Sequence, residues 1–357
     1  MSKKGVLDAT KIDLQELYIS QSEYQEIQTE FCDMIQQLTP GLYSQGQELI
    51  ERISTRNWAL EWGLPRWLGE AFNLSESTIH ELILANVFML GFVRIIDDVV
   101  DDDFQPSYSS IEWISKPNNQ LSFSSNNKHN EAILLGTLLQ NLWYKHHLNL
   151  LSQTGSKNNE LISSYLDAAT QSLSEWINAT SDQERRSPHG FSAFTEIDYL
   201  RMGHRFSPQK TCCIVACLVA GHDTEIQPLT KAIDHILIGV VMMDDIFDWL
   251  SDLQTGRYNV FTAFCSDLAQ TSEFRNANEL AILQAIYIDQ KIDSYFDLIL
   301  EHISTAEKAA MQATSPKFCK YISCLKSDIC AHKSSLSKII LSQMREASDR
   351  FLTNSLP

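Results

Sequence analysis

Hydrophobic residues along this chain gather into stretches of helical length, and short polar segments separate these stretches. The stretch 77–103 opens with a Ser/Thr pair typical of a helix start and then remains apolar until a run of acids. The sequence has no alternating strands joined by an Asn-Gly or Asp-Gly turn, and no repeat of fixed period. The pattern therefore predicts an all-α protein. The predicted helices cover residues 77–103, 130–152, 158–180, 209–220, 228–253, 276–304 and 317–348.

Two polar segments interrupt the helical pattern, at 104–129 and at 181–191. A loop of about 25 residues is unusual in a compact domain unless it has a function. Because 104–129 directly follows a run of acids, we predict that it is a flexible active-site loop. No linker separates two cores, so we predict one domain over residues 1–357, with 1–50 as an N-terminal helical extension.

Composition narrows the class of protein. The net charge of −17 argues against nucleic-acid binding, which needs basic surface. The eight cysteines form no C-x-x-C pair, which favours free thiols in a reducing compartment. The N-terminus lacks the apolar core of a secretory signal, and no uncharged apolar run reaches the ~18 residues of a membrane span. We therefore expect a cytoplasmic protein without a membrane span.

A cluster of aspartates follows the apolar run of the predicted helix 228–253. Asp244, Asp248 and Asp252 are spaced by four residues, so they spread over only about 80° of helix surface. Asp245 faces about 100° away from Asp244. A solvated acidic helix end is the simpler interpretation, but acids at the C-terminal end of a helix oppose its dipole. We therefore expect these carboxylates to face a partner that offsets both their mutual repulsion and the unfavourable interaction with the helix dipole.

A second cluster ends the predicted helix 77–103, with Asp97, Asp98 and Asp101 followed by two more acids. Two apolar helices that both end in acids suggest a cleft filled by cations. Oxygen ligands without His or Cys nearby indicate Mg²⁺, with Mn²⁺ as an alternative, and substrate phosphates usually complete such sites. The predicted metal ligands are Asp97, Asp98, Asp101, Asp244, Asp248 and Asp252.

The segment DDVVD at 97–101, paired with DDIFDWLSD at 244–252, resembles the two aspartate-rich motifs of the class I isoprenoid synthase superfamily. That superfamily includes trans-prenyl diphosphate synthases and class I terpene cyclases. The segment 132–144 resembles the helix between the motifs, and Lys210-Thr211 resembles a pair that helps to hold diphosphate. Within GRYN at 256–259, Arg257 stands where prenyl synthases have a Lys one residue further on.

The resemblance implies an all-α helical bundle around a central apolar cavity, with three Mg²⁺ at its mouth. The metals would bridge the aspartates and the diphosphate of a prenyl substrate. For each basic residue an ordinary surface ion pair is the alternative, more so for Arg94 and Arg201, and a homodimer is left open. The implied catalytic residues are Asp97, Asp98, Asp101, Lys210 and Arg257. The implied substrate-binding residues are Arg205, Lys210, Thr211, Arg257, Tyr258, Asn259, Phe92 and Phe247.

Departures from the motifs separate the branches of the superfamily. Chain-elongating synthases need a second basic pocket for isopentenyl diphosphate, but the stretch before the first motif has Arg66 alone and no basic residue follows Asp103 until Lys116. We therefore predict a terpene cyclase, a carbon–oxygen lyase. Phe92, five positions before Asp97, favours farnesyl diphosphate and a sesquiterpene product, with geranylgeranyl diphosphate next. A trans-prenyl diphosphate synthase and a non-catalytic isoprenoid-binding subunit are the alternatives.

Overall fold

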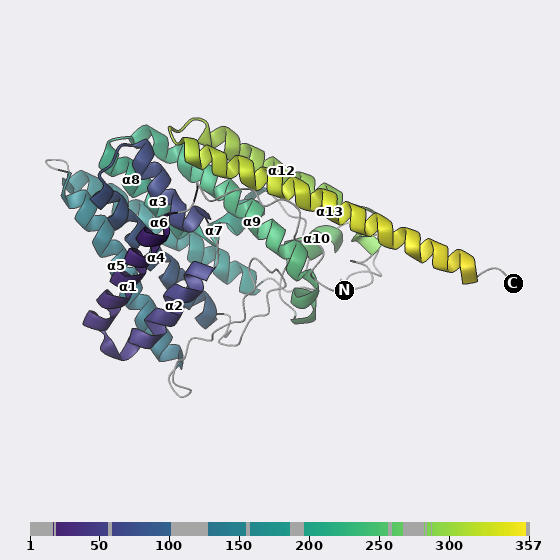
Figure 1. The fold of residues 1–357 in the computed structure, drawn as a ribbon, viewed down its shortest axis with the longest axis horizontal. Helices are drawn as coiled ribbons and strands as arrows, with labels where there is room; N and C mark the ends of the chain where they lie inside the picture. The colour runs from purple at the N-terminus through teal and green to yellow at the C-terminus, as the bar shows by residue number, and fades with distance from the viewer. Residues whose placement is uncertain are drawn as a thin grey trace.

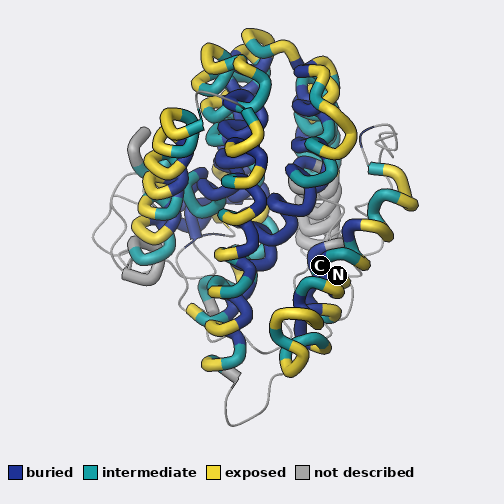
Figure 2. The backbone as a smooth tube through the Cα atoms, turned by 90° about the vertical axis from the view of Figure 1, so that its left-hand side faces the viewer, coloured by how far each residue is buried: buried dark blue, intermediate teal, exposed yellow. Residues whose placement is uncertain are grey.

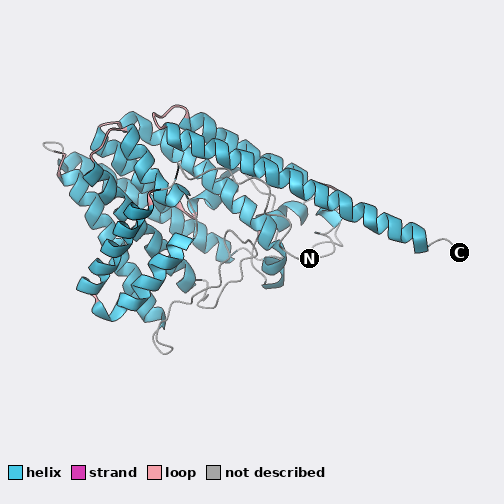
Figure 3. Ribbon diagram, viewed as in Figure 1, coloured by secondary structure: helices cyan, strands magenta, loops and turns pink. Residues whose placement is uncertain are grey.

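The computed structural model of the protein is helical throughout the residues it describes, which are 17, 19–55, 59–100, 128–154, 158–185, 196–255, 259–266, 282, 284–286 and 288–354. Figure 3 shows the helices, and this arrangement confirms the all-α prediction. Short 3₁₀ turns lie at η3 (Pro40–Leu42), η4 (Ser207–Gln209) and η5 (Asp223–Glu225). The α-helices are α1 (Gln21–Leu38), α2 (Tyr43–Thr55), α3 (Ala59–Ala71), α4 (Glu76–Val100), α5 (Lys128–Ser152), α6 (Asn158–Arg185), α7 (Glu196–His204), α8 (Lys210–Ala220), α9 (Ile226–Thr255), α10 (Val260–Ser266), α12 (Lys291–Ala310) and α13 (Pro316–Asn354).

Most helices lie at the residues that the hydrophobic pattern predicts, and the exception is the predicted helix 276–304. Helix α8 ends where Gly221 adopts the left-handed conformation, with φ at 72°. The prediction of one continuous helix over 276–304 was wrong, because residues 282 and 284–286 are helical but a turn at 288–290 separates them from α12, which begins at Lys291. The preceding Gln290 also has a left-handed backbone, with φ at 53°, and this ends any continuous helix there. Most of the predicted loop, residues 104–127, lies outside the described residues.

Helix α4 runs through the core, with every residue from 82 to 93 buried. This burial explains why its sequence is apolar on all sides. A Cβ at Gly91 would come within 3.0 Å of Leu139 on α5 and 3.2 Å of Leu49 on α2, so glycine allows three helices to approach closely. Figure 2 shows buried backbone through the centre and exposed residues on outward faces.

Two buried clusters of apolar side chains hold the helices together. The larger one surrounds α9 and α12 and includes the start of α13. The other surrounds α4 and takes Ile27 and Phe31 from α1 and Leu49 and Ile53 from α2. The predicted N-terminal extension is therefore helical in its described part, and it packs into the core.

Two stretches, Glu76–Val100 and Asp223–Leu250, are long and apolar enough to cross a membrane by length and composition alone. Their most apolar windows are 78% and 56% buried inside the protein, which is the pattern of core helices. Helix α13, with 39 residues, is about 58 Å long at 1.5 Å per residue. Its first half packs in the core through Phe318 and Ile322, and Figure 1 shows its other end reaching beyond the rest of the protein.

Candidate active site

The first acid motif is held from within the protein by two arginines. Arg52 on α2 donates to both carboxylate oxygens of Asp98, with Nη1–Oδ2 at 2.6 Å and Nη2–Oδ1 at 3.3 Å. Arg94, one turn before Asp98 on α4, adds a contact of 3.1 Å to Oδ1. The side chain of Asp98 is only 4% exposed, so its charge is neutralised in a buried setting. Asp98 therefore points inward, to the arginines.

Asp97 takes the opposite position, with its side chain 39% exposed and Arg94 at 3.5 Å. A hollow of about 70 Å³ lies beside it. That volume is far below the roughly 300–1,000 Å³ of small-molecule pockets, so the hollow does not hold a whole prenyl chain. Asp101 lies outside the described residues. The hollow is lined by Arg52, Ile53, Met89, Leu90, Val93, Arg94, Asp97, Phe206 and Gln209.

The second motif holds its buried carboxylate with hydrogen bonds. Asp245 is 9% exposed, and its Oδ2 accepts the backbone N–H of Val260 at 2.7 Å. Burial raises the pKa of Asp245 well above its usual value, although Arg205 and the Val260 N–H act against the rise. Asp244 is exposed, while Asp248 and Asp252 are partly exposed. The structure therefore places Asp245 apart from the three more accessible acids of its helix.

Asn259 connects the second motif to the next helix. Its amide nitrogen donates to the backbone oxygen of Asp245 and to Oδ2 of Asp252, both at 2.9 Å. Its amide oxygen accepts the N–H of Thr262 at 3.0 Å, which caps the start of α10. Both ends of this amide serve the protein itself, so nothing in the geometry supports the predicted contact of Asn259 with substrate. Arg257 and Tyr258 lie outside the described residues.

Lys210 lies in a buried ion-pair network and directly follows Gln209, which lines the hollow beside Asp97. Its Nζ is 2.7 Å from Oε2 of Glu175 on α6 and 3.0 Å from Oδ1 of Asp234 on α9. Ser207 also donates to Glu175. Asp234 precedes Asp244 by ten residues, about 15 Å along the helix. Lys210 is therefore engaged by two carboxylates, and this position gives no support to its predicted role on the diphosphate.

Charge balance within this network is reflected in its pKa shifts. Burial by itself raises the pKa of Glu175, but hydrogen bonds from Lys210 and Ser207 outweigh it and hold that pKa below its usual value. Burial raises the pKa of Asp234 despite the nearby Lys210. Thr211 is buried and donates to the backbone oxygen of Pro208 at 2.6 Å, so it too is used within the fold.

The aromatic candidates are packed against other side chains. Phe92 is 6% exposed and contacts the rings of Trp143 and Trp176, with centroids 6.2 and 5.3 Å away. Phe92 therefore packs against tryptophans from α5 and α6. Phe247 is partly buried and meets the ring of His332 on α13 at 6.2 Å. Arg205 is partly exposed and acts electrostatically on Asp245.

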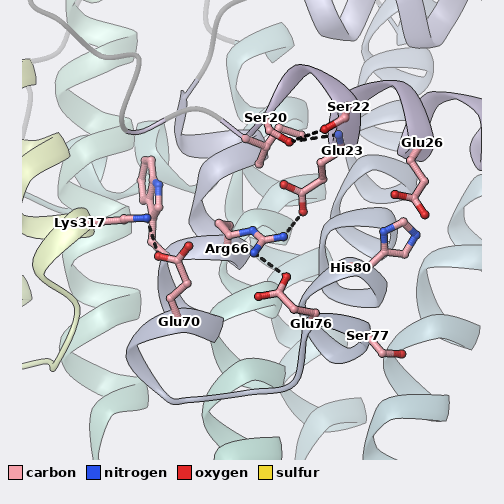
Figure 4. Close-up of a pocket in the computed structure, with 12 residues that line it drawn as sticks. Ser20, Ser22, Glu23, Glu26, Arg66, Glu70, Glu76, Ser77, His80 and Lys317 are labelled. Atoms are coloured by element: carbon pink, nitrogen blue, oxygen red, sulfur yellow. Dashed lines mark hydrogen bonds and ion pairs between the residues drawn. The ribbon is translucent and has the colours of Figure 1, made fainter.

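Arg66 lies at the other end of α4 from the first motif. Figure 4 shows it between Glu23 and Glu76, beside a second ion pair between Lys317 and Glu70. These residues line a hollow of about 690 Å³. Glu76 begins α4, and Asp97 follows it by 21 residues, about 31 Å away. Arg66 therefore contributes no cation to the acid motifs.

Among the described residues, no three His, Cys, Asp or Glu side chains come together closely enough to hold a metal ion. Of the predicted metal ligands, Asp98 contacts two arginines and Asp97 lies beside the hollow. Asp244, Asp248 and Asp252 lie along α9. Sequence reasoning missed Arg52, which precedes Asp98 by 46 residues and belongs to no motif. It also missed Glu175 and Asp234, for which a buried Lys210 was the only available signal.

No protein-family profile matches the sequence, and no curated protein matches it. Solved structures do. A geranylgeranyl pyrophosphate synthetase from Geoglobus acetivorans covers 86% of this chain and 98% of its own, with a TM-score of 0.63 at 16% identity. A decaprenyl diphosphate synthase from Rhodobacter capsulatus covers 88% and 97%, with a TM-score of 0.63 at 14% identity. The chain has the isoprenoid synthase fold.

A third structure with this fold, a polyprenyl synthase from Caulobacter crescentus, was solved with calcium and isoprenyl diphosphate. It covers 88% of this chain and 94% of its own, with a TM-score of 0.59 at 13% identity. At such identities the likeness concerns the isoprenoid synthase fold, and the reaction has to be argued from the residues of this chain.

Proposed function

We propose that this protein is a metal-dependent enzyme that ionises a linear prenyl diphosphate. The observation that carries this proposal is the position of Asp97, which lies beside an apolar hollow together with Arg52 and Arg94. Carboxylates suit a divalent cation, and guanidinium groups suit a diphosphate. Carboxylate and guanidinium groups therefore lie together near the end of α4, within the isoprenoid synthase fold.

The accessible carboxylates fit Mg²⁺ or Mn²⁺, because they are hard oxygen donors with no competing thiol or imidazole among them. Asp97 and Asp101 on the first motif, and Asp244, Asp248 and Asp252 on the second, would hold the metals. When bound, these ions act as Lewis acids that stabilise the departing diphosphate. Asp98 has a different task, because it keeps Arg52 and Arg94 at the edge of the site.

Condensation with isopentenyl diphosphate is the reaction that we favour. The lack of basic residues beside the first motif in the sequence favours a cyclase, but in the folded protein Arg52 reaches that motif from α2. Arg52 and Arg94 together carry one positive charge beyond that of Asp98, and this charge at the hollow beside Asp97 favours a diphosphate there. The solved structures named above are also synthases that act on prenyl diphosphates. The enzyme would then be a transferase with an allylic diphosphate and isopentenyl diphosphate as substrates.

Cyclisation of farnesyl diphosphate, or of geranylgeranyl diphosphate, is the second candidate. It is favoured by the distance of Arg66 from the motif and by the tryptophans that pack on Phe92. Tight aromatic packing limits the length of chain that the interior holds, which agrees with a C15 substrate. We further infer a cytoplasmic enzyme, and size-exclusion chromatography with light scattering would show whether it forms a homodimer.

The decisive experiment incubates purified protein with Mg²⁺ and labelled farnesyl diphosphate, with and without isopentenyl diphosphate. We expect a longer prenyl diphosphate only when isopentenyl diphosphate is present. A hydrocarbon or alcohol formed from farnesyl diphosphate alone would instead establish the cyclase. Binding of the diphosphate without turnover would indicate a non-catalytic subunit. Asp97→Asn should abolish turnover, while Glu26→Gln, on the outer face of α1, should leave it unchanged.

A further inference from the structure

A pair of histidines lies away from the acid motifs, where α9 packs against α12. Nδ1 of His235 on α9 is 3.0 Å from Nδ1 of His302 on α12. The rings are stacked, with centroids 5.2 Å apart and an interplanar angle of 30°. The ring of Tyr199, from α7, packs on His302 with centroids 5.4 Å apart. Because both histidines are only partly buried, two imidazole nitrogens from different helices meet where small solutes have access.

The spacing of these nitrogens is close to that of two ligands on one metal ion. Two imidazole nitrogens bound at about 2.0–2.1 Å to a tetrahedral ion lie about 3.3 Å apart. The observed separation of 3.0 Å is smaller by only about 0.3 Å, which small side-chain rotations supply. The proton now on one Nδ1 would move to Nε2 of the same ring as the metal enters, since a ligating nitrogen needs its lone pair and both rings stay neutral.

Protonation favours such binding at neutral pH. Burial, together with the nearby His302 and Lys231, lowers the pKa of His235 to about 4. The ring is therefore neutral under ordinary conditions, which is the form that a metal ion requires. Lys231 is exposed and lies one turn before His235, so its ammonium group can turn towards solvent.

We propose that His235 and His302 form a two-histidine site for a transition-metal ion of the Zn²⁺, Ni²⁺ or Cu²⁺ class. Imidazole nitrogens select these ions, whereas Mg²⁺ prefers oxygen ligands. In the part of the chain that the structure describes, no third His, Cys or carboxylate joins the pair, so water fills the remaining positions. The bound ion ties α9, which carries the second acid motif, to α12.

The test uses the full-length protein with saturating Mg²⁺, which occupies the acid motifs, and without diphosphate, so it does not depend on the proposed enzyme activity. Equilibrium dialysis against Zn²⁺ should give one ion per chain, and thermal unfolding should show a Tm that rises with the Zn²⁺ concentration. Loss of second-shell partners alone costs about 10–100-fold in metal affinity, so His235→Ala and His302→Ala should each weaken binding about tenfold or more. His222→Ala, whose imidazole pairs with Glu225 in another part of the fold, is the matched control.

Co²⁺ separates this site from binding by thiols. We expect weak visible bands in the wild-type protein, lost in both histidine variants, without the near-ultraviolet band of thiolate-to-cobalt charge transfer. A thiolate band would assign the ion to a cysteine such as the exposed Cys330 and overturn the proposal. Equal Zn²⁺ affinity in the wild type and in a His235→Gln, His302→Gln double variant that folds normally would overturn it as well.

Discussion

Asp98 near the end of α4 and Asp245 on α9 are each the second acid of an Asp-Asp pair, and both are buried. The protein stabilises them in different ways. The carboxylate of Asp98 faces the guanidinium groups of Arg52 and Arg94. The carboxylate of Asp245 accepts the backbone N–H of Val260, and the backbone oxygen of this residue accepts the side-chain amide of Asn259. Two guanidinium groups contact the carboxylate of Asp98 directly, whereas Asp245 has a hydrogen bond from a backbone N–H and the electrostatic influence of Arg205.

In both motifs the two acids of the Asp-Asp pair have different roles. In each pair the first acid, Asp97 or Asp244, is the more exposed one, and the second is turned into the protein. Adjacent residues on a helix lie about 100° apart, so an Asp-Asp pair at the rim of a core cannot present both side chains to the same ligand. The second acid then serves to order nearby groups, which are arginines at one motif and the start of α10 at the other.

The largest effect is expected from Asp98→Ala, because it leaves two partly buried guanidinium groups without their common partner. Breaking a buried ion pair by removal of one side costs about 3–5 kcal/mol in the free energy of unfolding. Arg52 and Arg94 are 19% and 20% exposed, so we expect the lower end of that range. Urea unfolding measures the loss. Asp97→Ala, at the more exposed neighbouring position, should cost less than about 1 kcal/mol, and equal losses in the two variants would contradict the division of roles.

The path of α4 and α9 was predictable from the sequence, whereas the partners of their acids were not. Both helices carry long apolar runs, and a helix that is apolar on all sides must be buried in the core. Arg52 is 46 residues from Asp98, and Glu175 is 35 residues from Lys210. These pairings depend on how α2 packs on α4 and how α6 packs at the start of α8, and no local pattern records that packing. The break before α12 was missed because nothing about a glutamine side chain signals the left-handed backbone conformation of Gln290.

Lys210→Met tests whether the compensation by full charge seen at Asp98 also holds where one cation faces two carboxylates. The variant leaves Glu175 and Asp234 without a cation, and we expect a loss of about 3 kcal/mol in the free energy of unfolding. Lys326→Met is the matched control, because Lys326 pairs with Glu307 at 2.7 Å near the surface. That control should cost less than about 1 kcal/mol. If Lys210→Met instead keeps full stability and loses only diphosphate affinity, the residue serves the substrate.

Lowering the pH should weaken the same network gradually. The pKa of Glu175 is held below its ordinary value of 4.5, so its contribution to stability is complete above that value and is lost as the pH falls through the lowered pKa. Unfolding free energies measured from neutral to acidic pH should therefore fall less steeply in Glu175→Gln than in the wild type. Glu160→Gln, at an exposed position of the same helix, should reproduce the wild-type slope.

Asn259→Ala removes the dipoles that connect the second motif to α10. The variant loses the cap on the Thr262 N–H and the two hydrogen bonds towards α9. Loss of such a cap costs about 0.5–2 kcal/mol. We expect a loss within that range by urea unfolding, with Asn259→Asp recovering the cap but placing a further charge beside Asp252. An alanine variant as stable as the wild type would show that the backbone alone positions α10.

Asp245→Asn should have the smallest effect and gives the sharpest contrast with the first motif. The amide oxygen of asparagine can still accept the Val260 N–H, and the change removes a charge that burial disfavours. We therefore expect the free energy of unfolding to change by less than about 1 kcal/mol. Asp98→Asn, the same chemical change at the first motif, should cost clearly more, because it removes the counter-charge that Arg52 and Arg94 share. Equal losses from the two isosteric variants would mean that Asp245 also depends on its charge, and Arg205 would then be the group that compensates it.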